Sequence, residues 1–101
     1  MTNVTIVDYG MGNLFSVRMA LEQCGAKVIM TTDPEEMIQA DRLILPGVGA
    51  FNMGMSGICK NGIDVAIKDA RNKGTPLMGI CLGMQMLFEY SEEFGHTNGL
   101  G

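Results

Sequence analysis

Short β-rich runs alternate with longer helical runs along this chain, and that alternation constrains its fold more than any other feature. Runs typical of strands occupy residues 3–8, 26–31, 42–45 and 77–80. Helices are expected over residues 14–24, from residue 34, and over residues 50–60, 63–73 and 82–90. Strands that alternate with helices in this way predict an α/β fold, an open parallel sheet with helices on both faces (flavodoxin-like).

The expected helix ends carry residues that favour starting or stopping a helix. Asn13 precedes the first helix as an N-cap, and Asp33 followed by Pro34 precedes the second. Gly25 is placed to end the first helix, and Gly74 to end the helix over residues 63–73. After residue 90 the chain becomes polar and rich in glycine, and we expect a tail there.

Composition excludes several classes of protein. With 47% apolar residues the chain is too hydrophobic to be disordered, and its net charge of −4 with scattered basic residues argues against nucleic-acid binding. No apolar run is long enough to span a membrane, and no secretory signal is visible. Three cysteines without regular spacing predict neither a disulfide framework nor a zinc site. We therefore expect a cytoplasmic protein without metal or cofactor.

The strongest local signal is the pentapeptide at residues 79–83, Gly-Ile-Cys-Leu-Gly, where a buried strand meets a helix. This is the spacing of a nucleophile elbow with cysteine as the nucleophile, Cys81. The turn exposes the sulfur at the positive end of the next helix, which favours the thiolate. The N–H of Leu82 would then face a developing oxyanion. The alternative is a buried cysteine between two packing glycines.

Two glycine-rich loops follow other strands at the same expected sheet edge. Residues 46–49, Pro-Gly-Val-Gly, can point backbone N–H groups at an anion, or can form an ordinary tight turn. Residues 10–12, Gly-Met-Gly, lack the further glycine of a dinucleotide fingerprint, because position 15 is Phe15. This first loop either lines the same cleft or is a plain turn.

A cysteine nucleophile usually needs a base, most often histidine. His96 is the single histidine, and it lies in the polar tail without apolar periodicity around it. We expect it to be a solvated loop residue. The chain therefore offers a nucleophile and an oxyanion loop without a complete triad.

Three motifs together resemble the class I glutamine amidotransferases. The elbow continues through Met84 and Gln85, where several members of that family carry histidine at the position of Met84. The methionine form, with residues 7–14 and 45–51, is similar to the glutaminase subunits of imidazole glycerol phosphate synthases. The resemblance extends from the first strand to Gly101.

That resemblance implies an activity and a partner. Such subunits hydrolyse glutamine, and a cyclase subunit bound as a heterodimer uses the ammonia in histidine biosynthesis. By matching position, Cys81 would form a glutamyl thioester, and the backbone of Gly47, Val48 and Leu82 would make or gate the oxyanion hole. The remaining implied roles are glutamine binding by Gly49 and Gln85, and contact with the partner or the ammonia path by Tyr9, Gly10, Met11, Gly12 and Asn13.

The family's catalytic His and Glu lie in its C-terminal half, and this chain ends before them. We therefore expect residues 1–101 to be the N-terminal portion of one amidotransferase domain, inactive or nearly so by itself. Three other interpretations remain open at this stage. They are a relative that feeds ammonia to a sugar-modifying synthase, a non-catalytic partner-binding module, and a generic flavodoxin-like ligand binder.

Overall fold

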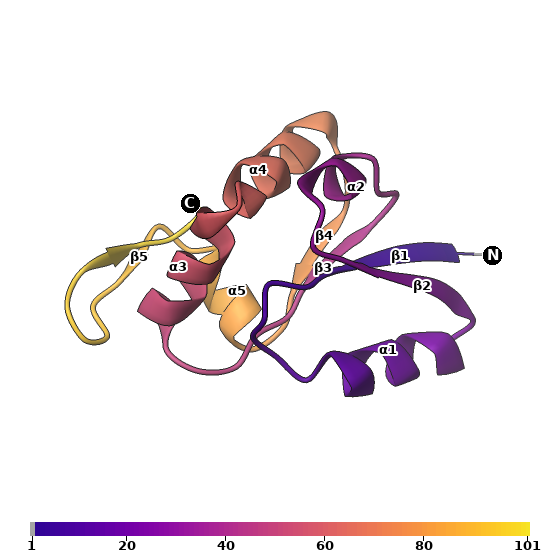
Figure 1. Cartoon of the computed structure of the whole chain (residues 1–101), viewed down its shortest axis with the longest axis horizontal. Coiled ribbons are helices and arrows are strands. Elements are labelled where there is room, and N and C mark those ends of the chain that lie inside the picture. Colours follow the sequence, from indigo (N-terminus) through magenta and orange to yellow (C-terminus); the bar gives the residue numbers. More distant parts are fainter. Residues whose placement is uncertain (1) are drawn as a thin grey trace.

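A parallel four-stranded sheet forms the centre of the molecule in a computed structural model that describes residues 2–101. The strand order is β2-β1-β3-β4 (Figure 1). The strands are β1 (Thr2–Val7), β2 (Ala26–Thr31), β3 (Leu43–Leu45) and β4 (Leu77–Gly79). Because all pairings are parallel, the loops that follow β1, β3 and β4 leave from one edge of the sheet.

Helices cover both faces of this sheet, as the sequence predicts. On one face, α1 (Leu14–Gln23) packs against Val4, Ile6 and Ile44. The other face carries the remaining helices, as Figure 1 shows for α2 and α4. These are α2 (Pro34–Ile38), α3 (Phe51–Lys60), α4 (Ile63–Lys73) and α5 (Leu82–Met86). The α/β fold with helices on both sides is therefore confirmed.

The expected helix-capping residues are in place. The side chain of Asn13 accepts a hydrogen bond from the Ser16 N–H, and that of Asp33 accepts one from the Glu35 N–H. Gly74 ends α4 in the left-handed conformation. These local signals were readable from the sequence because each depends on residues only a few positions apart.

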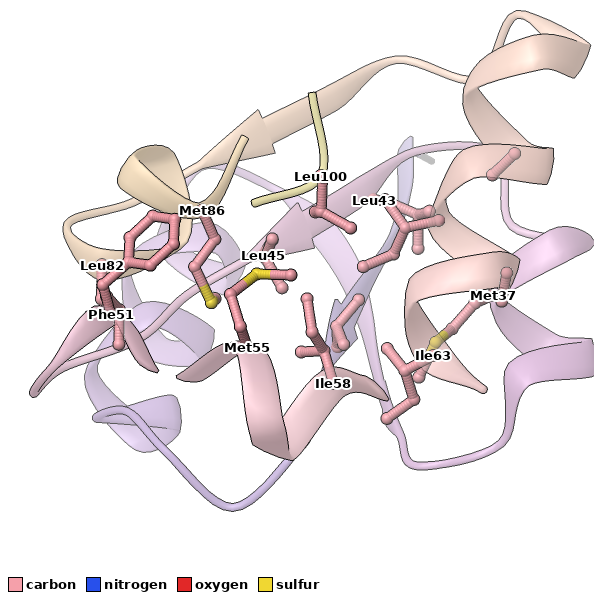
Figure 2. Packing of buried hydrophobic residues seen from close by; sticks show 14 residues of the cluster. Met37, Leu43, Leu45, Phe51, Met55, Ile58, Ile63, Leu82, Met86 and Leu100 are labelled. Atoms are coloured by element: carbon pink, nitrogen blue, oxygen red, sulfur yellow. The ribbon is translucent and has the colours of Figure 1, made fainter. Parts of the chain in front are cut away.

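The main core lies between the sheet and the helices α2 to α5. Leu45 of β3 is fully buried there, and Figure 2 shows Phe51, Leu82 and Met86 packed at one end of the cluster. Leu82 and Met86 are both on α5, so the helix that follows Cys81 is fixed by its apolar side. The core thus positions the turn from which the cysteine projects.

The last helix is shorter than expected, and the tail is not irregular. The expectation of a helix over residues 82–90 is wrong, because α5 ends at Met86 and Leu87 is its C-cap. The chain then forms an antiparallel hairpin of β5 (Tyr90–Ser91) and β6 (Thr97–Asn98). After the hairpin it returns to α5, where the N–H of Leu100 donates to the Met86 carbonyl and its side chain enters the core. The returning segment donates hydrogen bonds to carbonyls at the end of α5, so these carbonyls do not accept the hydrogen bonds that would extend the helix.

Among residues 2–101, no helix is both long enough and apolar enough to cross a membrane.

Candidate active site

Cys81 occupies a strained turn between β4 and α5. Its backbone angles are φ 55° and ψ −121°, and its side chain is exposed. A residue other than glycine with positive φ costs about 1–3 kcal/mol and persists only where its surroundings enforce it. The turn therefore holds the thiol out of the interior at the first residues of α5, as a nucleophile elbow does.

Two glycines allow this turn to pack against its neighbours. A Cβ on Gly79 would lie 2.5 Å from the Met84 Cα, and one on Gly83 would overlap the Leu45 carbonyl oxygen. The obstacles are backbone atoms, which cannot swing aside as a flexible side chain can. The glycines on either side of Cys81 are thus a steric requirement of the turn.

Exposure alone does not single out Cys81, because Cys24 and Cys59 are also exposed and free. The Cys59 Sγ lies 3.6 Å from a carboxylate oxygen of Asp64. The pKa of its thiol is raised, first by burial and second by that carboxylate. A raised pKa disfavours the thiolate, which is the reactive form. Cys81 differs from both in its backbone conformation and in its place at the start of a helix.

The loop after β3 lies directly against the Cys81 turn. The Ile80 N–H donates to the Leu45 carbonyl at 3.0 Å, and the Leu82 N–H donates to the Gly47 carbonyl at 3.2 Å. Gly47 is buried in this contact, whereas Val48 and Gly49 are exposed. The structure therefore brings Gly47 and Leu82 together, but the Leu82 N–H is already paired. An oxyanion can use that N–H only after the Gly47 carbonyl turns away.

The loop after β1 packs onto the same segment. The Tyr9 hydroxyl donates to the Pro46 carbonyl at 2.7 Å, and burial raises the pKa of Tyr9 to about 12. A Cβ on Gly12 would lie 3.4 Å from the Gly47 Cα. In the same loop, Met11 reaches toward Gly49, to within 3.1 Å of where a Cβ would stand, and Gly10 is exposed. This loop thus supports the loop after β3, while Asn13 is engaged as the cap of α1.

Gln85 opens onto a cavity beside the cysteine turn. The cavity has a volume of about 370 Å³. It is lined by Phe51, Met84, Gln85, Phe88, Tyr90, Ser91 and Glu93. Neither Cys81 nor Gly49 is among these residues, so the structure does not join Gln85 and Gly49 in one pocket.

Glu93 is a polar residue of this cavity that the sequence analysis missed. One of its carboxylate oxygens accepts a hydrogen bond from the Phe51 N–H at 3.0 Å, which places a negative charge at the start of α3. No spacing rule links positions 51 and 93, because the contact depends on the hairpin after α5. Only the acidic pair Glu92-Glu93 after an apolar helix hinted at a role.

His96 takes part in the hairpin. Its Nε2 lies 2.9 Å from the Asn98 Oδ1, and its ring stacks on Tyr90 with centroids 4.9 Å apart. The ring is exposed, as expected for a loop histidine. His96 is the single histidine of residues 1–101, so these residues offer Cys81 no other imidazole as a base.

Comparison with known proteins identifies the family. The model of the family "Glutamine amidotransferase class-I" matches residues 5–96. The chain belongs to this family. The match includes the Cys81 turn and both glycine-rich loops, so the resemblance of the sequence motifs is confirmed.

Curated relatives in the family agree closely in sequence. The imidazole glycerol phosphate synthase subunit HisH of Bacillus licheniformis is 52% identical over 98 residues, covering 97% of this chain and 46% of that protein. HisH of Halalkalibacterium halodurans is 55% identical over 95 residues, covering 94% of this chain and 44% of that protein. The chain spans about half the length of the curated relatives it matches.

Solved structures agree in fold. A structure described as a glutamine amidotransferase superposes with a TM-score of 0.81 at 21% identity, covering 97% of this chain and 51% of that one. A putative peptidase E from Listeria monocytogenes gives a TM-score of 0.76 at 16% identity, over 99% of this chain and 62% of that one. At these identities the likeness shows the α/β fold of the family and nothing about substrate.

Proposed function

We propose that this chain supplies the nucleophile of a glutaminase, with Cys81 attacking the side-chain carboxamide of glutamine. The observation that carries the proposal is the exposed Cys81 with positive φ at the start of α5. Attack forms a thioester and expels ammonia, and water then releases glutamate and restores the thiol. Both steps require a proton carrier, which the resemblance assigns to the family's C-terminal His and Glu.

In this proposal the oxyanion of the tetrahedral intermediate binds at the contact between the loop after β3 and α5. The Leu82 N–H is one donor, and the peptide between Gly47 and Val48 supplies the second after it turns. Their present hydrogen bond supports the assignment, because it places the N–H and the loop within one peptide rotation of each other. Donors arranged in advance in this way stabilise a developing charge strongly.

The cavity beside α5 is our proposed site for the amino-acid end of glutamine. The amide of Gln85 and the carboxylate of Glu93 line this cavity, and both can form hydrogen bonds with an ammonium group and the polar atoms beside it. Gly49, exposed on the loop after β3, would contact the substrate from the opposite side. A volume of about 370 Å³ is within the usual range of small-molecule sites.

The ammonia is proposed to pass to a cyclase subunit bound as a heterodimer, which makes imidazole glycerol phosphate in histidine biosynthesis. Support comes from the curated relatives, which are named imidazole glycerol phosphate synthase subunit HisH. The loop at residues 9–13 would face that partner or the ammonia path. Three free thiols fit a reducing compartment, so we place the protein in the cytoplasm.

Selective labelling of the cysteines tests the nucleophile. A glutamine analogue carrying a chloroketone should modify Cys81 in preference to Cys24 and Cys59, and glutamine should protect Cys81. A small alkylating agent without a glutamine moiety should reach all three exposed thiols, which makes it the matched control. Peptide mass spectrometry identifies the modified residue. Equal labelling of the three would favour a generic ligand binder, and no labelling at Cys81 in a chain that carries the family's C-terminal half would favour a non-catalytic module.

A polypeptide of residues 1–101 alone should turn over glutamine far more slowly than roughly 1 per second, the lower end of typical enzyme rates. The reason is that these residues provide the nucleophile without a histidine base. Ammonia release measured by a coupled assay checks this. A rate typical of enzymes from this polypeptide would refute the need for the family's His and Glu.

A further inference from the structure

Tyr9 joins two loops that converge on the Cys81 turn. Its hydroxyl donates to the Pro46 carbonyl at 2.7 Å, although the two residues lie 37 positions apart. The side chain is partly buried, and burial raises the pKa of the hydroxyl to about 12. The proton needed for this hydrogen bond is therefore present at any physiological pH.

The Tyr9 ring also fills space left by two glycines. A Cβ on Gly47 would overlap the Tyr9 hydroxyl oxygen, and a Cβ on Gly57 of α3 would lie 3.1 Å from the ring Cδ2. The ring is thus held between α3 and the loop after β3. Its hydroxyl lies directly over Gly47, so the loop cannot move toward β1 while Tyr9 stays in place.

The Tyr9 hydroxyl binds the Pro46 carbonyl, and the next carbonyl along the chain, that of Gly47, accepts a hydrogen bond from the Leu82 N–H. Leu82 is the first residue of α5, and the first N–H groups of a helix have no acceptor within the helix. Its acceptor is the Gly47 carbonyl, one peptide unit after the Pro46 carbonyl. The Gly47–Val48 peptide could turn about the soft backbone bonds of Gly47, so the restraint on it comes from packing, because the Tyr9 hydroxyl fills the space beside the Gly47 Cα.

We propose that Tyr9 is a positioning residue that keeps the Gly47 carbonyl on the Leu82 N–H and so keeps this oxyanion donor closed. The proposal rests on the proposed function, in which that N–H binds the oxyanion. In this proposal Tyr9 acts through the Pro46–Gly47 peptide, which its hydroxyl contacts. Any event that displaces the Tyr9 loop would release the donor.

The test removes only the hydroxyl, with Tyr9→Phe in the natural full-length protein. Hydrogen exchange at the Leu82 amide should become about fivefold faster, the change expected for loss of one ordinary hydrogen bond. The Gly83 amide is the internal control, because it donates to Ile80 within the same turn. Tyr90→Phe is the control variant for the exchange measurement alone, since it removes a hydroxyl from the other tyrosine, which is exposed but lines the proposed substrate cavity.

The same variant has a kinetic signature. Without the cyclase partner, kcat for glutamine should rise by a similar factor while KM stays unchanged, because the released N–H acts on the transition state rather than on bound substrate. Equal acceleration of the Leu82 and Gly83 amides, an unchanged or lower kcat, or failure of Tyr9→Phe to fold would each overturn the proposal.

A double-mutant cycle gives a second, independent measurement. Gly47→Ala should lower the midpoint of thermal unfolding less in the Tyr9→Phe background, because the hydroxyl that the new Cβ would overlap is gone. Additive effects would contradict the close contact on which the proposal depends. Labelling of Cys81 by the glutamine analogue separates the two hypotheses. If Cys81 is not labelled but exchange at Leu82 accelerates in Tyr9→Phe, the glutaminase is contradicted and the role of Tyr9 stands. If Cys81 is labelled but exchange at Leu82 does not change, the role of Tyr9 is contradicted and the glutaminase stands.

Discussion

Cys81→Ser abolishes glutamine-dependent product formation, with an expected loss of at least about a thousandfold, whereas formation from free ammonia at the cyclase partner survives. The serine hydroxyl is a far weaker nucleophile than a thiolate at neutral pH, so attack on the carboxamide at position 81 is lost. Both activities are measured on the assembled protein with its cyclase partner, with saturating glutamine in one assay and ammonium salt in the other.

Cys24→Ser and Cys59→Ser are the matched controls for this substitution. Both thiols are exposed and away from the strained turn, so both variants should keep near-normal activity with either nitrogen source. Loss of both activities in Cys81→Ser would show that Cys81 supports the fold or the complex. Retention of both would remove it from the chemistry altogether.

Gly83→Ala destabilises the protein by about 3 kcal/mol or more. The new methyl group would overlap the Leu45 carbonyl oxygen at the end of a fully buried strand, so either α5 or β3 has to move. Chemical denaturation followed by circular dichroism measures the loss in the free energy of unfolding.

Gly25→Ala separates steric overlap from backbone strain. Gly25 has φ +90° and no atom near its would-be Cβ, so alanine there should cost only about 1 kcal/mol, the price of a left-handed conformation. If Gly83→Ala costs no more than Gly25→Ala, the close approach of α5 to β3 is not a requirement of the turn.

Sequence reasoning succeeded where the determining residues are near one another in the chain. The alternating strands and helices, the caps at Asn13 and Asp33, and the elbow around Cys81 all depend on spacings of a few positions. The parallel sheet followed from that alternation, because parallel strands need long connections.

The features that escaped prediction depend on contacts between distant segments. α5 ends early because Leu100 returns to the Met86 carbonyl, and Glu93 reaches the cavity because a hairpin brings it to Phe51. The pairing of the Leu82 N–H with Gly47 is likewise set by packing of one loop on another helix. Periodicity and local propensity carry no information about such pairs.

The overlap that excludes a side chain at position 83 also ties reactivity to the whole fold. Because α5 sits on the backbone of the central strand, the corner holding the sulfur cannot relax while the sheet remains intact. On heating, the geometry of the thiol should therefore stay unchanged until the domain unfolds cooperatively, without an intermediate in which activity alone is reduced. A substitution that loosens the contact between α5 and β3 to raise the reaction rate would also destabilise the fold.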